Sequence, residues 1–270
     1  MKESIVNSIK SLPPLSKTIM EIEKVYNDSE AGVVEMAKVI EKDPMVVANL
    51  LKAANSPLYG FANEIKNVRQ AVSLFGLSTT RSLAIGNAVR KLLNVDMEPY
   101  GITSERFAEI SSMQGALALR WFKQIAPEKA EAMHLMALLQ ETGKILIANA
   151  VIQEDETIAF RSEIEMSNNI PAVEKSFVDT TASIVSAMIF GHWNFDDRFV
   201  ETIKYADYPS QAPEEIAFEA QALHIVKTVI PVNKPLSENA ISFGMNKAEK
   251  FGFDEEMLQE CINELGEAVN

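Results

Sequence analysis

The strongest constraint on the fold is the spacing of the apolar residues, which recur every three or four positions along most of the chain. This spacing gathers them on one face of a helix, whereas a half-buried strand needs an apolar residue at every second position. The N-terminal half contains no such alternation, and the second half follows the same helical pattern. The sequence therefore predicts an all-α protein.

Polar residues and prolines indicate where the N-terminal helices begin. Ser16 follows the extended segment around Pro13 and Pro14 and is a predicted N-cap. Asp43 and Pro44 suit the N-cap and the first helical position of a later helix. The helices expected in this half cover residues 19–26, 33–40, 44–54, 68–75 and 79–92, with Gly76 ending the fourth in a left-handed conformation.

The second half continues with longer helical segments. A helix is expected over 103–122, and another opens at Pro127, is interrupted at Thr142 and Gly143, and resumes over 145–152. Prolines and Gly244 predict that residues 231–244 form an internal loop. Further helices are expected over 154–167, 171–190, 196–206, 213–229 and 254–268.

Charge is distributed unevenly along the chain. Residues 1–100 hold 12 basic and 11 acidic side chains, whereas residues 101–270 hold 13 basic and 27 acidic ones. This shift predicts two subdomains, residues 1–100 and residues 101–270. The acidic half should repel nucleic-acid phosphates, and the first half lacks dense basic clusters, so no nucleic-acid partner is expected.

Composition also indicates in which compartment of the cell the protein is expected. The apolar stretches are shorter than the ~20 residues of a membrane span, and the first residues do not resemble a secretory signal. Cys261 is the only cysteine, so neither an internal disulfide nor a cysteine-based zinc cluster can form. We therefore expect a cytoplasmic protein that does not insert into membranes.

Most catalytic templates are absent from the sequence. It contains no glycine-rich phosphate loop and no G-x-S-x-G nucleophile elbow. No two of His134, His192 and His224 have the spacing that places two metal ligands on one helix face, so a structural role is favoured for each. Cys261 is interpreted as a packing residue rather than a nucleophile. The residues thus indicate no catalytic group, metal site or cofactor.

Five short segments occur in order over about residues 12–207. Together they resemble the HDOD family. Its members are degenerate relatives of HD-type metal-dependent phosphohydrolases and are associated with bacterial signal transduction. The resemblance implies an all-α fold in which an N-terminal helical subdomain packs on an HD-like helical bundle. The residues that carry it are Pro13, Pro14, Asp43, Pro44, Asn55, Ser56, Gly60, Gly76, Gly143, Lys144 and Trp193.

The resemblance also implies that an ancestral metal site has been lost. HD phosphohydrolases hold two cations that clamp the attacking and leaving oxygens of a phosphate ester. At the positions where the family has metal ligands, only Glu141 and Asp207 of this sequence carry a carboxylate. Two carboxylates do not make a preorganised site for two metal ions. Lys144 is expected to pair with Glu141 as a modest helix-surface contact. The six vestigial positions are Ser111, Gln140, Glu141, Ala182, Ala206 and Asp207.

Three functions remain open at this point. The first is a non-catalytic regulatory protein that binds an unidentified protein partner in a signalling pathway, and the loop over residues 55–61 is one candidate for that contact. The second is a sensor that binds a nucleotide or another small molecule in the vestigial pocket. The third is a residual phosphohydrolase, which the missing ligands disfavour.

Overall fold

The computed structural model describes residues 1–93 and 96–269, and within those ranges it contains helices and no strand. Contacts divide the chain into two compact units. The larger unit comprises Met1–Leu12 and Leu93–Gly266, and the smaller unit comprises Pro13–Leu92 with Glu267–Asn270. The all-α prediction is confirmed.

This division differs from the expected one, in which residues 1–100 form one subdomain, because the first twelve residues belong to the larger unit. They form α1 (Glu3–Lys10), a helix that we did not expect from the sequence. Ile5 is fully buried and Ile9 nearly so, and the backbone N–H of Lys2 donates to Val178 O at 3.2 Å. Apolar burial thus joins α1 to α8 and α11 of the larger unit rather than to the helices that follow it in the chain.

The smaller unit is built from four α-helices whose predicted caps are present. Ser16 accepts a hydrogen bond from Ile19 N, and Asp43 accepts from Met45 N at 3.0 Å. The helices are α2 (Lys17–Tyr26), α3 (Val33–Ile40), α4 (Pro44–Ala54) and α5 (Val68–Leu93), with a single 3-10 turn over Pro57–Tyr59. Gly76 adopts φ +76° and ψ 172° inside α5, so the two helices expected there join across a kink.

The loop after α4 is closed by Asn55. Its amide donates to Leu51 O at 2.8 Å and to Ile65 O at 2.9 Å, and its carbonyl oxygen accepts from Ile65 N at 2.8 Å. The rings of Tyr59 and Phe61 lie edge-on to Phe75, with centroids 4.8 Å and 5.2 Å apart. The two loop aromatics therefore pack within the smaller unit, which weakens the hypothesis that they anchor a partner.

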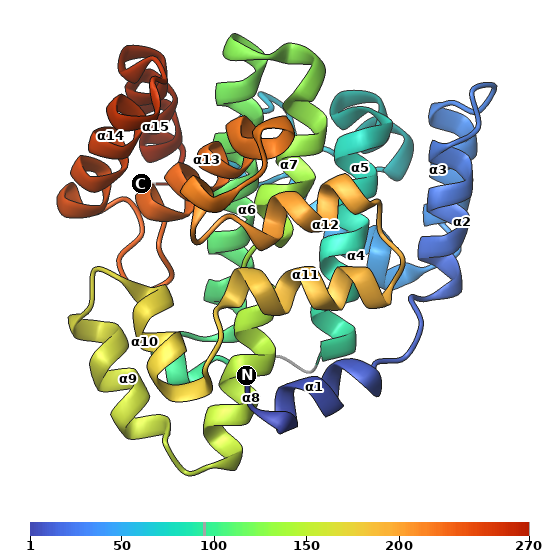
Figure 1. Cartoon of the computed structure of the whole chain (residues 1–270). Coiled ribbons are helices and arrows are strands. Elements are labelled where there is room, and N and C mark those ends of the chain that lie inside the picture. The colour runs from blue at the N-terminus through green and yellow to red at the C-terminus, as the bar shows by residue number, and fades with distance from the viewer. Residues whose placement is uncertain (94–95, 270) are drawn as a thin grey trace. The chain divides into compact units, whose positions relative to one another are not determined.

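The larger unit contains α1 and the helices from α6 onward as far as Gly266 (Figure 1). Within it α6 lies along α7, α8 contacts α11, and α13 contacts α6, α7, α12 and α14. The helices after α1 are α6 (Ser104–Ile125), α7 (Ala130–Leu139), α8 (Gly143–Gln153), α9 (Thr157–Met166), α10 (Ile170–Val178), α11 (Ala182–His192), α12 (Asp197–Lys204), α13 (Glu214–Val229), α14 (Glu238–Phe251) and α15 (Glu255–Val269).

One segment, Pro127–Gln153, is long and apolar enough to cross a membrane by length and composition. It is longer than the apolar stretches considered from the sequence. However, 89% of its apolar window is buried inside the fold, and the segment is divided between α7 and α8. Both features are those of a core element.

Two expected element boundaries are wrong. Residues 171–190 form two helices rather than one, because Asp179 adopts a left-handed conformation with φ 54° and ends α10. Residues 231–244 are not one loop, since Ser237 caps α14 and Gly244 lies inside it. A Cβ at Gly244 would lie 2.2 Å from Val229 Cγ2. Gly244 thus permits close approach of α13 and α14 and does not mark a turn.

Candidate functional site

The site begins at the junction of α7 and α8. Residues 140–142 form a buried turn between the two helices, in which Thr142 Oγ1 donates to Leu139 O at 2.7 Å. The next residue, Gly143, lies so close to α11 that a Cβ there would be 2.3 Å from Ala182 O and 2.7 Å from Ser186 N. The absence of a side chain at Gly143 therefore brings Glu141 and Lys144 against α11.

Five charged side chains form a buried cluster, which we call the lysine–carboxylate network: Glu141, Lys144, Glu174, Asp207 and Lys227. Glu141 Oε2 lies 2.9 Å from Lys144 Nζ, and Glu141 Oε1 lies 3.2 Å from Lys227 Nζ. Lys144 also pairs with Glu174, and Lys227 pairs with Asp207. All five side chains are at most 7% exposed, so each ammonium neutralises carboxylates that are largely removed from water.

Additional donors satisfy the remaining oxygens of the network. Glu174 Oε1 accepts from Tyr100 Oη at 3.0 Å, and Glu174 Oε2 accepts from Ala182 N at 2.7 Å. Asp207 Oδ2 accepts from Ser183 N at 3.1 Å. Glu141 is held differently, since its two oxygens lie at ion-pair distance from Lys144 and Lys227, and Oε2 has no hydrogen bond of good geometry.

Burial and neighbouring charge shift the pKa values of the network in different directions. Burial alone would raise the pKa of Asp207, but Lys227 holds that pKa well below its usual range. Burial alone would lower the pKa of Lys227, but Asp207 and Glu141 raise it well above its usual range. Burial raises the pKa of Glu174, against the opposing charge of Lys144. Asp207 and Lys227 thus keep their charges, and Glu174 is more readily protonated than Asp207.

The expected pairing of Lys144 with Glu141 is present, but its environment was misjudged. Both side chains are at most 4% exposed, so the contact is a core ion pair and not a helix-surface one. The physical reason is the turn at residues 140–142, which directs both side chains into the bundle rather than along one exposed helix face.

The structure places the other expected positions around and beside the network. The backbone N–H of Ala182 contributes the hydrogen bond to Glu174, and Ala206 O contacts His224 Nδ1 at 2.7 Å. Gln140 Nε2 instead donates to Gln114 Oε1 at 3.0 Å, in a separate buried amide pair. Ser111 Oγ donates to Phe107 O at 2.9 Å along its own helix.

Sequence reasoning did not identify Glu174 and Lys227. Lys227 is a charged residue within the mainly apolar run 222–230, whereas Glu174 follows Val173 but is itself followed by Lys175 and Ser176 on α10. A lysine on the buried side of an apolar helix requires an anionic partner, and this signal pointed to a buried ion pair. The partners could not be identified from sequence, because Lys227 pairs with Glu141 between α7 and α8 and with Asp207 after α12, and Glu174 pairs with Lys144 on α8.

The residues present do not fit the two metal ions of HD phosphohydrolases. The network contains no histidine that could bind a metal together with its three acids. The oxygens of these acids already contact ammonium, amide or hydroxyl groups. Among residues 1–93 and 96–269, no group of three or more His, Cys, Asp or Glu side chains has a metal-binding arrangement. A cation here would have to displace a lysine ammonium from its carboxylates.

The histidines and the cysteine lie apart from one another. His134 is fully buried in α7, and His192 Nε2 contacts Leu12 O at 3.2 Å. Cys261 is buried and accepts a hydrogen bond from Gln124 Nε2 at 3.3 Å. Burial raises the pKa of the Cys261 thiol to about 11, which disfavours the nucleophilic thiolate.

His134 leads to a pH-dependence prediction. Burial lowers its pKa from 6.5 to about 4, so between those values the unfolded chain binds a proton that the folded chain does not. The stabilisation is complete above pH 6.5 and is lost as the pH falls, by roughly 3 kcal/mol of unfolding free energy. Urea unfolding of the wild type and His134→Gln from pH 7 to pH 4 should show a shallower pH dependence in the variant. An identical dependence would contradict this assignment.

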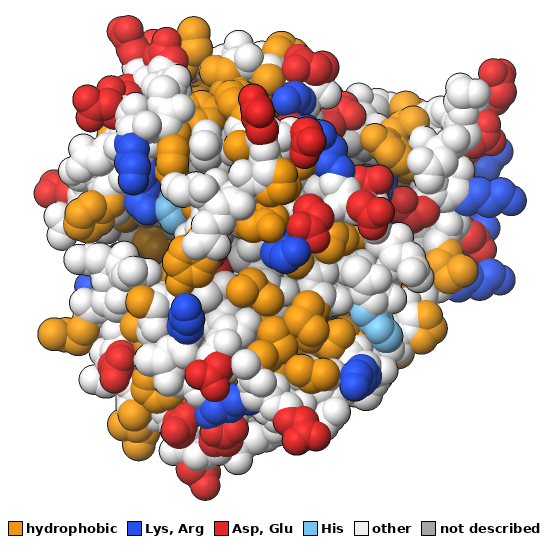
Figure 2. Space-filling model, viewed as in Figure 1, with side chains coloured by type: hydrophobic (Ala, Val, Ile, Leu, Met, Phe, Trp, Pro, Cys, Tyr) orange, Lys and Arg blue, Asp and Glu red, His pale blue; other side chains and the backbone are white. Residues whose placement is uncertain are grey.

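A cleft of about 460 Å³ opens onto the network, and its lining includes Glu141, Lys144, Asp207 and Lys227. α14 and the segment before it contribute further lining residues. In Figure 2 the surface is hollowed near α14, with basic side chains and one histidine at the rim. The vestigial positions Glu141 and Asp207 therefore lie at a site that a small molecule can reach.

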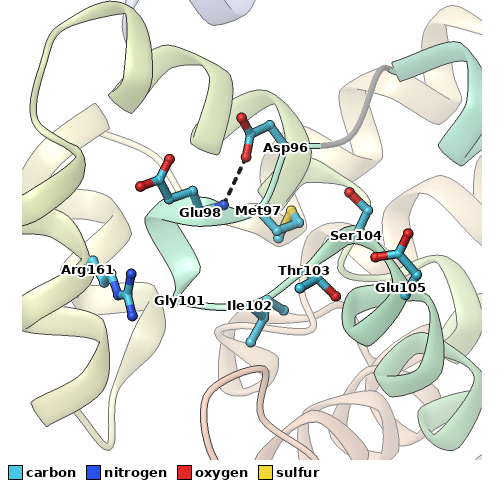
Figure 3. A pocket seen from close by; sticks show the side chains of 9 residues that line it. All are labelled: Asp96, Met97, Glu98, Gly101, Ile102, Thr103, Ser104, Glu105 and Arg161. Atoms are coloured by element: carbon cyan, nitrogen blue, oxygen red, sulfur yellow. Dashed lines mark hydrogen bonds between the residues drawn. The ribbon is translucent and has the colours of Figure 1, made fainter.

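A second cavity, of about 440 Å³, is lined mainly by acidic rather than basic side chains among its charged residues (Figure 3). Asp96, Glu98 and Glu105 line it, and Arg161 is its one basic lining residue among those described. Arg161 Nε already donates to Glu165 Oε1 at 2.9 Å. None of the six expected site positions lines this acidic cavity, so we place the candidate site at the larger cleft.

Comparison with known proteins agrees with this architecture. An uncharacterized protein of Treponema pallidum (strain Nichols) is 24% identical over 216 residues, which cover 78% of this chain and 40% of that protein. The chain thus spans about 40% of the length of this relative.

Two crystal structures share the fold. A protein of Shewanella amazonensis SB2B, proposed to be a phosphohydrolase, has a TM-score of 0.72 at 20% identity, with 99% of this chain and 98% of that one covered. A protein of Marinobacter aquaeolei VT8, proposed to act in signal transduction, has a TM-score of 0.72 at 21% identity, with coverages of 98% and 62%.

The match to a family model is more specific than these fold similarities. The model described as the HDOD domain matches residues 12–209, which include the turn at residues 140–142, Glu174 and Asp207. Lys227 and α14, which complete the network and the cleft, lie beyond the matched range. On the match to most of its length, this chain belongs to the HDOD domain family.

Proposed function

We propose that this chain is a non-catalytic regulatory HDOD protein of the bacterial cytoplasm, which acts by binding a protein partner in a signalling pathway. The observation that carries the non-catalytic assignment is the position of Lys227 Nζ, which contacts carboxylate oxygens of both Glu141 and Asp207. An ammonium there supplies positive charge but has no open coordination position at which to activate water.

Fold similarity does not choose between the alternatives. One protein of the same fold is proposed to be a phosphohydrolase and another to act in signal transduction. Fold class permits both, so the decision depends on the residues at the site. The lysine–carboxylate network favours the regulatory assignment, and the accessible cleft favours a small-molecule sensor as the second candidate.

An activity assay tests the non-catalytic assignment. The purified protein, supplied with Mn²⁺ or Mg²⁺, should hydrolyse phosphomonoesters and cyclic dinucleotides no faster than a sample without protein. Glu141→Ala serves as the matched control, because a contaminating hydrolase would remain active in both preparations. Turnover in the wild type that disappears in Glu141→Ala would establish the residual phosphohydrolase instead.

The protein partner is tested separately. Affinity capture from the native host, followed by reconstitution with the purified candidate, should give a complex that remains intact in gel filtration. If no captured protein binds the purified chain directly, the partner-binding part of the proposal is wrong. The sensor would then be the better interpretation.

A further inference from the structure

The cleft above the network is strongly basic, although the whole chain carries a net charge of −13. Its lining contains five lysines but only two carboxylates, those of Glu141 and Asp207. Lys144 and Lys227 are paired with these acids and with Glu174. Three lysines remain in the lining, namely Lys234, Lys247 and Lys250.

Within residues 1–93 and 96–269, no carboxylate lies within salt-bridge distance of those three ammonium groups. Lys247 and Lys250 are three residues apart on α14, and Lys234 precedes that helix. The spacing places Lys247 and Lys250 on one helix face, where their charges repel. Such a concentration of unpaired positive charge in a cleft attracts an anion.

His224 holds Lys247 in place. Lys247 Nζ contacts His224 Nε2, and His224 Nδ1 donates to Ala206 O at 2.7 Å. This chain of contacts needs a neutral imidazole with its proton on Nδ1. Burial and the charge of Lys247 lower the pKa of His224 to about 4, and burial, Lys250 and Lys227 lower the pKa of Lys247. A bound anion would offset the positive charge that adds to the effect of burial in both shifts.

Aromatic side chains lie in the same cleft. Phe243 on α14 is 43% exposed and Tyr208 is 39% exposed, and both line the cavity. An exposed ring beside a cationic group is the arrangement that binds a base and a phosphate together. The volume of about 460 Å³ lies within the usual range of small-ligand sites.

We propose that this cleft binds a nucleotide-like ligand, with its phosphate at Lys234, Lys247 and Lys250 and its planar ring against Phe243 or Tyr208. The inference rests on the proposed function in one respect, because the ligand is held without being cleaved. It names the ligand class that the sensor alternative would require.

Calorimetric titration of the full chain tests the site with adenosine monophosphate, guanosine monophosphate, pyrophosphate and adenosine as probes. At least one phosphate-bearing probe should bind, and adenosine should bind more weakly. Lys247→Ala/Lys250→Ala should raise the dissociation constant by about a hundredfold, since each of the two lost charged hydrogen bonds costs about a factor of ten. Lys123→Ala/Lys204→Ala, which removes two lysines that do not line the cleft, is the control and should bind as the wild type does.

Phe243→Ala separates the two halves of the ligand. This variant or Tyr208→Ala should weaken binding of the mononucleotide and leave pyrophosphate binding unchanged, and unchanged mononucleotide binding in both would contradict the ring contact. Absence of binding by all phosphate-bearing probes at millimolar concentration would overturn the inference, as would equal affinities in the lysine variant and its control.

Recovery of the probe after titration distinguishes this inference from the proposed function. Binding with intact recovery supports both. Binding with cleavage supports the site and contradicts the non-catalytic assignment. No binding, together with no hydrolysis, contradicts the site alone.

Discussion

Replacing Lys227 with methionine should destabilise the larger unit by about 3–5 kcal/mol, the usual cost of removing one partner from a buried ion pair. The lysine neutralises Asp207 and Glu141, and its side chain is only 7% exposed. Without it, both carboxylates stay buried and lose their common cation. The measurement is urea unfolding at pH 7, monitored by circular dichroism.

A double variant shows whether charge or packing causes the loss. Lys227→Met/Asp207→Asn removes one positive and one negative charge together, so it should be more stable than Lys227→Met alone. Lys204→Met is the matched control, because Lys204 pairs with Glu201 at an exposed position and should change stability by less than about 1 kcal/mol. Equal losses in Lys227→Met and Lys204→Met would contradict the importance of the network.

Gly143→Ala should be nearly as damaging, with an expected loss of roughly 3 kcal/mol. The added methyl group would lie 2.3 Å from Ala182 O and 2.8 Å from Val185 Cβ, both on α11. Because these atoms belong to helix backbone and a buried side chain, α8 and α11 would have to separate. That movement would also disturb the hydrogen bond from Ala182 N to Glu174.

Gly266→Ala is the matched control for this substitution. Gly266 lies in α15, and a Cβ there would meet no atom within 4 Å. Alanine is the better helix former, so this variant should gain up to about 1 kcal/mol. Thermal unfolding of both variants measures the difference, and a Gly143→Ala protein as stable as the wild type would show that the close approach is not required.

Local rules of helix capping made much of the fold predictable. Asp43 with Pro44 fixed a helix start because the carboxylate accepts backbone N–H groups of the first turn. Gly244 was misassigned to a loop because a glycine that ends a helix and one that permits helix contact look alike in sequence. Only the position of Val229 on the neighbouring helix distinguishes the two roles.

The candidate site was predictable to a smaller extent. Family resemblance drew attention to Glu141 and Asp207, and the i, i+3 spacing indicated the pairing of Lys144 with Glu141. The completion of the network by Glu174 and Lys227 depends on contacts between residues 20 to 86 positions apart, which helical periodicity does not encode. Burial of the whole cluster likewise follows from the packing of α8, α10, α11 and α13.

We propose that Lys144 and Lys227 supply the positive charge at this site in place of metal ions. Thermal unfolding of the purified wild type with Mn²⁺, and after treatment with EDTA, tests it most directly. We predict the same melting temperature in both conditions. A metal at a hundred times its dissociation constant would add about 2.7 kcal/mol and raise the melting temperature by several degrees. Stabilisation of the wild type by Mn²⁺, abolished in Glu141→Ala, would contradict the claim.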